Sequence, residues 1–155
     1  KSLDISINHT SFEHPKINAR IHVFADVPHL LKLARNHLLV SGFILPNGKF
    51  IGKNILQELL NINHGKDYKF AHKLSERHLF VDGSSRMNVR LAANVFSNSV
   101  SKAIAYCGEK HYLDKYNRKE ASEIIQLFND WFDIFNTQHK FDKVYRQIIA
   151  TILSR

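Results

Sequence analysis

The sequence has little of what small secreted proteins, membrane proteins and disordered chains contain. Its single cysteine, Cys107, excludes a disulfide framework and any zinc site built from several cysteines. With only 6 glycines and 3 prolines, a long linker or a turn-rich all-β fold is disfavoured. No apolar run approaches the roughly 20 residues that cross a bilayer, and the N-terminal segment contains no secretory hydrophobic region. We therefore expect a soluble, intracellular chain without a membrane partner.

Acidic residues are too few to balance the basic ones. The chain has 22 Lys and Arg against 14 Asp and Glu, which gives a formal net charge of +8. Such an excess favours polyanionic partners, nucleic acid or nucleotide phosphates, through long-range attraction and counterion release. The alternative is a solvated basic surface without a specific partner. Because the basic residues are spread along the chain, a tail-like arm that binds nucleic acid is disfavoured.

The common nucleotide-binding and metal-binding motifs are also absent. The phosphate loop, in which four residues separate two glycines and Lys and Ser or Thr follow the second, does not occur. The segment NGKFIGKN supplies glycines and lysines without that spacing or the hydroxyl residue. The guanine motif Asn-Lys-x-Asp is missing, and the 10 histidines include no His-Glu-x-x-His pair. We therefore interpret the histidines as surface and capping residues rather than as metal ligands.

Hydrophobic periodicity predicts a mostly helical body that follows a short piece of α/β structure. A strand is expected from the alternation at Leu3, Ile5 and Ile7, and a central strand from the apolar run of residues 21–25. Two such strands cannot form a stable sheet alone, so we expect a fragment of a larger protein. A small hairpin is expected around the Pro-Asn-Gly turn of residues 46–48. The expected helices cover residues 28–40, 54–60, 88–106, 119–136 and 141–153.

An apolar run stops at Asp26 in the segment VFADVPHLLKLARNHLL, residues 23–39. One interpretation is a helix cap, in which the carboxylate accepts N–H bonds that the first turn leaves unpaired. Pro28 fits the start of that helix, where its missing N–H costs nothing. The other interpretation is a functional carboxylate at the end of a buried strand. The motif by itself leaves both interpretations open.

The segment FNDWFDIFN, residues 128–136, combines aromatic and acidic side chains. Phe128 and Trp131 are most simply core residues of a helix. Asp130 and Asp133 are two acids within an aromatic stretch of a basic protein. A carboxylate beside an aromatic ring can hold a purine base by accepting its N–H groups while the ring stacks on it. The alternative is a pair of acids on the solvent face of the helix.

Four separated segments match a family pattern in the order that the family has them. They are FADVPHLLKLARNHL, AHKLSERHLF, SSRMNVRLAANVFSNSVSKAIAY and EIIQLFNDWFDIFN, and they cover most of residues 21–136. In these segments the chain resembles the P element transposases and the THAP-type transposase-like proteins of animals. The resemblance implies a mainly α fold in two parts. Residues 1–41 would be a strand-helix fragment of an α/β RNase H-like catalytic domain, and residues 42–155 a helical GTP-binding insertion domain.

The resemblance also implies roles for individual residues. Asp26 would be a catalytic carboxylate and Mg²⁺ ligand, with the remaining carboxylates outside this chain, because two-metal phosphoryl transfer needs several of them. Lys32 and Arg35, which follow Asp26 closely, are our candidates for contacting the DNA backbone. The implied GTP-binding residues are Lys73 at the phosphates, Asn88 and Val89 beside the nucleotide, Phe132 against the base, and Asp133 and Asn136 at its polar edge.

The function predicted on this basis is that of a central fragment of a P element-like DNA transposase. Its ligands would be GTP, Mg²⁺ and transposon-end DNA, and its parent would be a nuclear protein that forms homo-oligomers. The fragment alone is not expected to cut or join DNA. Two alternatives remain at this stage: a domesticated, non-catalytic relative that keeps DNA or GTP binding, and a helical interaction module whose basic charge is incidental.

Overall fold

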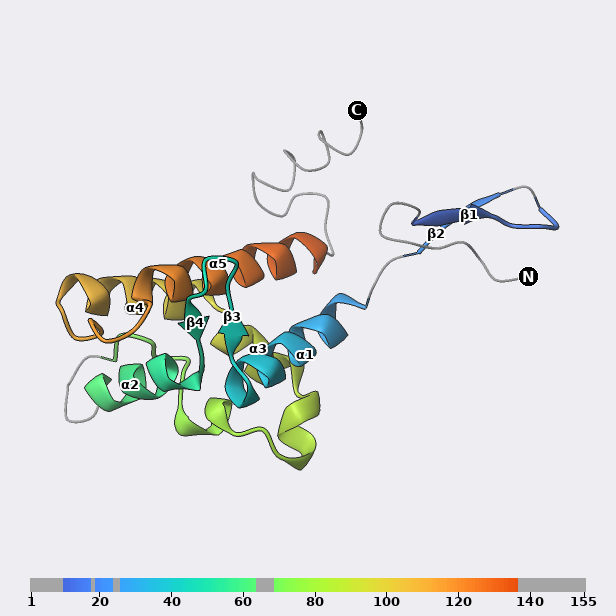
Figure 1. The fold of residues 1–155 in the computed structure, drawn as a ribbon. Coiled ribbons are helices and arrows are strands. Elements are labelled where there is room, and N and C mark those ends of the chain that lie inside the picture. Colours follow the sequence, from blue (N-terminus) through green and yellow to red (C-terminus); the bar gives the residue numbers. More distant parts are fainter. Residues whose placement is uncertain (1–9, 18, 24–25, 64–68, 137–155) are drawn as a thin grey trace.

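The computed structural model of this chain describes residues 10–17, 19–23, 26–63 and 69–136. Helices predominate in these residues, as the sequence predicts (Figure 1). Among the helices described, none combines the length and the apolar character needed to cross a membrane. The strand expected at Leu3, Ile5 and Ile7 and the helix expected over residues 141–153 lie outside the described residues.

The first hairpin differs from the expected central strand. Strands β1 (Ser11–Glu13) and β2 (Arg20–His22) pair antiparallel, with Phe12 opposite Ile21. Figure 1 draws this two-stranded ribbon apart from the helical body. The predicted central strand over residues 21–25 is corrected for residues 21–23, because β2 ends at His22 and Val23 is 41% exposed. Residues 24–25 lie outside the described part of the chain. A two-stranded ribbon offers no layer that would cover such a strand on both faces.

Helix α1 (Val27–Val40) confirms the helix expected over residues 28–40. Asp26 precedes it in extended conformation, and its Oδ1 accepts a hydrogen bond from the His29 backbone N–H at 3.2 Å. Ser41 caps the C-terminal end of the helix, and Gly42 follows with a φ of 76°, a conformation that favours glycine. The second hairpin, β3 (Phe43–Ile44) with β4 (Phe50–Ile51), is also confirmed, and α2 (Lys53–Asn63) follows it.

The helix expected over residues 88–106 is two helices in the structure. After the short helices η1 (Glu76–Leu79) and η2 (Gly83–Met87) come α3 (Val89–Val95) and α4 (Asn98–Glu109). The chain leaves the helical path at Phe96 and is extended at Ser97. This break lets the buried Phe96 ring pack on Phe128, with ring centroids 4.5 Å apart. The side chain of Asn129 accepts the Asn98 N–H at 3.0 Å and so fixes the start of α4.

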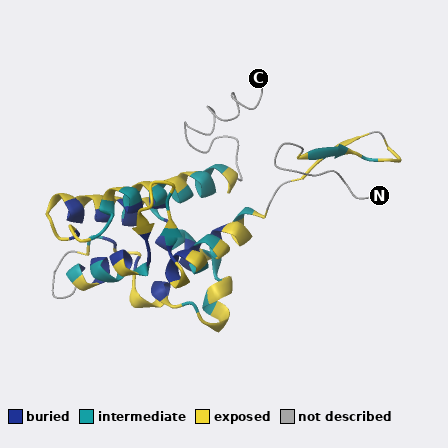
Figure 2. Ribbon diagram, viewed as in Figure 1, coloured by how far each residue is buried: buried dark blue, intermediate teal, exposed yellow. Residues whose placement is uncertain are grey.

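Helix α5 (Arg118–Phe135) confirms the expected helix over residues 119–136 and packs along α4 (Figure 1). Its apolar stripe covers one hydrophobic core, which Figure 2 shows as the buried inner faces of the helices. Leu31 and Leu38 of α1 belong to this same core, together with residues of α2, α3 and α4. The domain boundary predicted after residue 41 lies between α1 and β3. The residues on both sides of this boundary contribute to the same hydrophobic core.

Candidate functional site

The six predicted GTP-binding residues lie on three segments of the helical body. Lys73 is exposed in the turn before η1, a short helix that packs against α2 and α3. Asn88 caps α3, and its Oδ1 accepts the Leu91 N–H at 3.1 Å. Half-buried Val89 follows it. The third segment is the C-terminal part of α5, and the structure places α3 and α5 in contact with one another.

The end of α5 holds an aromatic ring and a carboxylate next to each other. Phe132 is half-buried and packs against the core, whereas Asn136 is exposed just after the helix. Asp133 is also half-buried, and its Oδ2 accepts a hydrogen bond from Asn129 Nδ2 at 3.3 Å. This bond orients the carboxylate from inside its own helix. Asp133 therefore combines partial burial with a defined orientation, as a base-reading acid requires.

Asp130 differs from Asp133 although both lie on α5. Its side chain is exposed, and its Oδ1 accepts hydrogen bonds from Gln126 Nε2 at 2.8 Å and from Asn129 Nδ2 at 3.2 Å. Asp130 thus matches the alternative of an acid on the solvent face. The two acids make a matched pair, one half-buried and one exposed, for testing the pocket by substitution.

Asp26 is a helix cap in this structure, as the first interpretation predicted. One carboxylate oxygen accepts the His29 N–H, and the other has no hydrogen-bond partner among the described residues. A cap that occupies one oxygen leaves the second oxygen for a metal ion, so capping and metal binding are compatible. Within the part of the chain that the structure describes, no group of three or more His, Cys, Asp or Glu side chains could hold a metal ion. The catalytic role of Asp26 stays a prediction.

Arg35 was predicted to contact DNA, and the structure corrects this assignment. Its side chain is fully buried. The guanidinium donates to three backbone carbonyl oxygens, at 2.9 Å to His78, 2.6 Å to Phe80 and 2.9 Å to Ser85. Burial lowers the pKa of Arg35, and the negative charge of Asp82 partly offsets this. Lys32 is only half-buried, so its predicted contact with the DNA backbone remains a prediction.

Arg35 instead connects α1 to the segment that leads into α3. The carbonyls that it binds lie in η1, in η2 and between them, and neighbouring Asn36 donates from Nδ2 to the Arg86 carbonyl at 3.1 Å. The same segment ends at Asn88, the cap of α3. The sequence does contain a signal for this role. Position 35 lies four residues after Leu31 and three before Leu38, on the stripe of α1 that faces the core.

His78 is a second buried polar residue of this segment that the sequence analysis missed. Its Nδ1 lies 3.1 Å from the Ser75 backbone N and 2.9 Å from Ser75 Oγ, and its Nε2 lies 3.0 Å from the Asn94 side-chain amide. Because a backbone N–H can only donate, Nδ1 carries no proton and the imidazole is neutral. In the structure Asn94 Nδ2 faces Nε2, so the amide must flip for its oxygen to accept the Nε2–H.

This arrangement predicts a loss of stability in mild acid. Burial lowers the pKa of His78 below its ordinary 6.5. The hydrogen bond with the Ser75 backbone opposes this shift, and the charges of Arg35 and Arg77 add to it. The unfolded chain therefore binds a proton more readily than the folded one, so the contribution is complete above about pH 6.5 and is lost as the pH falls below it. We expect the melting temperature to fall from pH 7 to pH 5. His78→Asn keeps an acceptor for the Ser75 N–H and should flatten this profile.

Exposed His72 provides the matched control. His72→Asn should leave the pH profile of the melting temperature as it is in the unmodified chain. An unchanged slope in His78→Asn would show that other groups cause the acid sensitivity.

Comparison with known proteins now identifies the family. A family model described as TNP-like, GTP-binding insertion domain matches residues 28–148. The chain belongs to this family. The transposable element P transposase of Drosophila melanogaster is 39% identical over 137 residues, which are 88% of this chain and 18% of that protein. The chain of the Drosophila P element transposase strand transfer complex matches with a TM-score of 0.84 at 38% identity, covering 92% of this chain and 32% of that one.

These comparisons confirm the resemblance to P element transposases and the mainly helical fold. The TNP-like insertion domain described here spans less than a third of the solved relative and less than a fifth of the curated one. The family match begins at Pro28 and so includes nearly all of α1, in agreement with the core that α1 shares with the later helices.

Proposed function

We propose that this chain is the GTP-binding insertion domain of a P element-like DNA transposase and that it binds GTP as a cofactor. The observation that carries the proposal is the family match over residues 28–148, which includes every predicted GTP-binding residue. The oriented, half-buried carboxylate at the end of α5 agrees with it. GTP in this proposal organises the protein for DNA binding, as the resemblance to P element transposases implies. The lack of a hydrolytic phosphate loop in the sequence agrees with this role.

The proposed contacts follow from the chemistry of guanine and of phosphate. Phe132 provides a ring against which the base stacks, while the Asp133 carboxylate accepts both the N1–H and the exocyclic amino group. Asn136 lies at the polar edge of the base. Lys73 supplies a positive charge for the phosphates. Because Asn88 Oδ1 is engaged by the Leu91 N–H, its Nδ2 remains to donate to a phosphate oxygen beside Val89.

The rest of the parent protein completes the proposal. Residues before α1 would belong to an RNase H-like domain, so we place the boundary near Asp26 rather than at residue 41, because α1 is part of the helical core. Asp26 would then hold Mg²⁺ together with carboxylates of the parent protein that this chain does not include. The metal, when bound, would stabilise the attacking and leaving oxygens of phosphoryl transfer to transposon-end DNA. The parent would be a nuclear homo-oligomer.

Base selection tests the GTP site. We expect Asp133→Asn to weaken GTP binding by about 2–4 kcal/mol, because a charge-assisted two-point contact is lost. The same variant should favour xanthosine triphosphate, since xanthine has a carbonyl in place of the amino group and an asparagine amide can donate to it. Phe132→Ala should weaken both nucleotides alike. The measurement is a calorimetric titration of both nucleotides against the parent protein.

Asp130→Asn is the matched control, because it makes the same chemical change in an exposed acid of the same helix. It should leave the affinities for both nucleotides unchanged. Wild-type affinity and preference for GTP in Asp133→Asn would place Asp133 outside the nucleotide site and remove the base-reading part of the proposal.

A further inference from the structure

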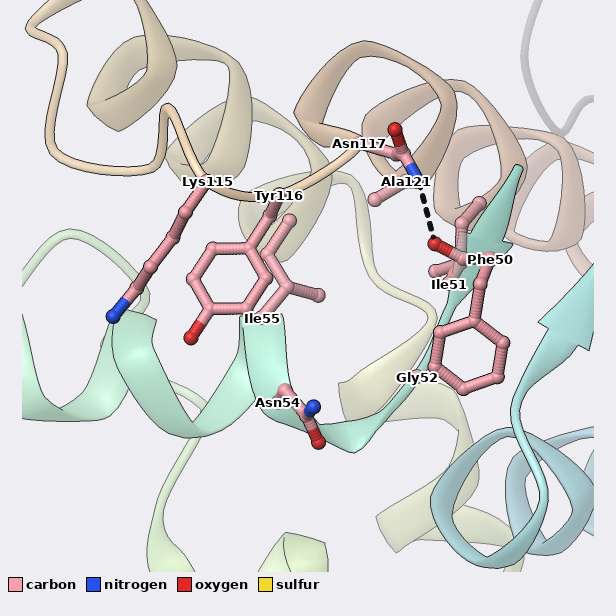
Figure 3. A pocket seen from close by; sticks show the side chains of 9 residues that line it. All are labelled: Phe50, Ile51, Gly52, Asn54, Ile55, Lys115, Tyr116, Asn117 and Ala121. Carbon is pink, nitrogen blue, oxygen red and sulfur yellow. Dashed lines mark hydrogen bonds between the residues drawn. The ribbon is translucent and has the colours of Figure 1, made fainter.

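A pocket of about 240 Å³ lies at the other end of α5, between the second hairpin, the start of α2 and the loop before α5 (Figure 3). Its floor is apolar and includes Ile55 and Ala121. Figure 3 shows the rings of Phe50 and Tyr116 on opposite sides of it, with Asn54 between them at its lower edge. The pocket thus offers two aromatic rings, which this view shows side by side.

This pocket is separate from the proposed GTP site. Asn117 lines the pocket just before α5 begins, whereas Phe132 and Asp133 lie near the end of that helix. A rise of 1.5 Å per residue puts the two ends roughly 22 Å apart. None of the six residues assigned to GTP lines the pocket.

The Phe50 ring is held in place although it is 48% exposed. It lies against two glycines: a Cβ added at Gly42 would come within 2.3 Å of the ring, and one added at Gly52 within 2.7 Å. The backbone of Phe50 is held as well, because its carbonyl accepts a hydrogen bond from Asn117 Nδ2 at 2.9 Å (Figure 3). An exposed aromatic ring that is already immobilised loses little conformational entropy when a ligand stacks on it.

Polar groups without partners border the same space. Among the described residues, neither the Tyr116 hydroxyl nor the Asn54 side-chain amide has a hydrogen-bond partner. The Lys115 ammonium lies 5.4 Å from the centre of the Tyr116 ring and is 3.9 Å from Glu58, its nearest acid contact. With its side chain 68% exposed, Lys115 can turn toward an anion at the mouth of the pocket.

We propose that this pocket binds the base of a nucleotide, stacked on the Phe50 ring with Tyr116 beside it, and with the phosphate at Lys115. The amide of Asn54 and the hydroxyl of Tyr116 provide a donor and acceptors for the polar edge of the base. Stacking on aromatic side chains accepts any base, since every base has a π-face. The net charge of +8 favours a ligand that carries phosphate over a neutral aromatic compound. The base belongs either to an unpaired nucleotide in DNA or to a free nucleotide.

Fluorescence quenching of pyrrolocytosine, which falls in intensity when it stacks, tests this proposal with the whole 155-residue chain. One arm titrates a short oligothymidylate with a single pyrrolocytosine, and the other titrates free pyrrolocytidine monophosphate. A pyrimidine probe avoids a guanine-selective site, so failure here is distinct from failure of the GTP proposal. We expect saturable quenching that Phe50→Leu weakens about tenfold, since base-aromatic stacking contributes this much.

Two further variants separate the loss of stacking on Phe50 from a nonspecific effect of substitution on binding. Gly52→Ala should reproduce the loss, because the new methyl group displaces the Phe50 ring and lies close to no other side chain. Phe80→Leu is the control, an equally exposed phenylalanine outside the pocket, and should bind as the unmodified chain does. Quenching in the oligonucleotide arm alone assigns the base to a DNA strand, and quenching in both arms shows that a single nucleotide suffices. No quenching in either arm, or an unaffected Phe50→Leu, overturns the proposal.

Discussion

Under the proposed function, Asp26→Asn is expected to abolish strand transfer by the parent protein while folding and DNA binding persist. The asparagine side chain retains an oxygen in the position of Oδ1, so it can still accept the His29 N–H that starts α1. It cannot supply the negative charge that Mg²⁺ requires from its ligands. The substitution therefore separates the observed role of Asp26 from the proposed one, because it preserves the cap and removes the charge that the proposed metal ligand would supply. Strand-transfer assays with labelled transposon ends, together with a melting curve, provide the measurement.

The control is Asp130→Asn, which should retain strand transfer because the same change occurs in an exposed acid that binds no metal in this proposal. Full activity in Asp26→Asn would reduce Asp26 to a helix cap. Binding of transposon ends or GTP by the unmodified parent protein without any cutting of DNA would instead favour the alternative of a domesticated, non-catalytic relative. Absence of both binding activities would favour the helical interaction module.

Arg35→Met is expected to lower the free energy of unfolding by about 3–5 kcal/mol. This is the range found when one partner of a buried, charged hydrogen-bond network is removed. Methionine fills much of the same volume but removes the guanidinium donors of all three carbonyls. The His78 carbonyl loses its donors, whereas the Phe80 carbonyl keeps the Ser85 hydroxyl and the Ser85 carbonyl keeps the Asn88 N–H. Lysine keeps the charge, yet it lacks the planar fork that reaches three carbonyls at once, so Arg35→Lys should also lose most of this stability. Urea denaturation of each variant gives the values.

Arg90→Met serves as the matched control, since Arg90 is exposed on α3 and its replacement should change stability by no more than about 0.5 kcal/mol. If Arg35→Met unfolded at the same urea concentration as the unmodified chain, the carbonyls would have found other donors and Arg35 would not anchor the segment. A DNA-binding defect without a loss of stability would restore the original prediction that Arg35 contacts phosphate.

The sequence by itself determined the elements whose signals are local. The apolar spacing of residues 28–40, 54–60 and 119–136 predicted α1, α2 and α5, and the Pro-Asn-Gly turn predicted the second hairpin. Capping by Asp26 was also predictable, because a cap involves only residues within one turn. Four motifs in order were enough to indicate the family, which the comparisons confirm.

Only the tertiary structure decided what depends on residues distant in sequence. The break between α3 and α4 accompanies the packing of Phe96 on Phe128 and the bond from Asn98 to Asn129, and helical periodicity runs through this break without a signal. The burial of Arg35 depends on carbonyls more than 40 residues away, so its charge alone suggested a surface position. The pocket between Phe50 and Tyr116 likewise exists because a hairpin and the start of a distant helix meet. Periodicity reports which face of a helix is buried, whereas the partner that covers this face is set by packing of the whole chain.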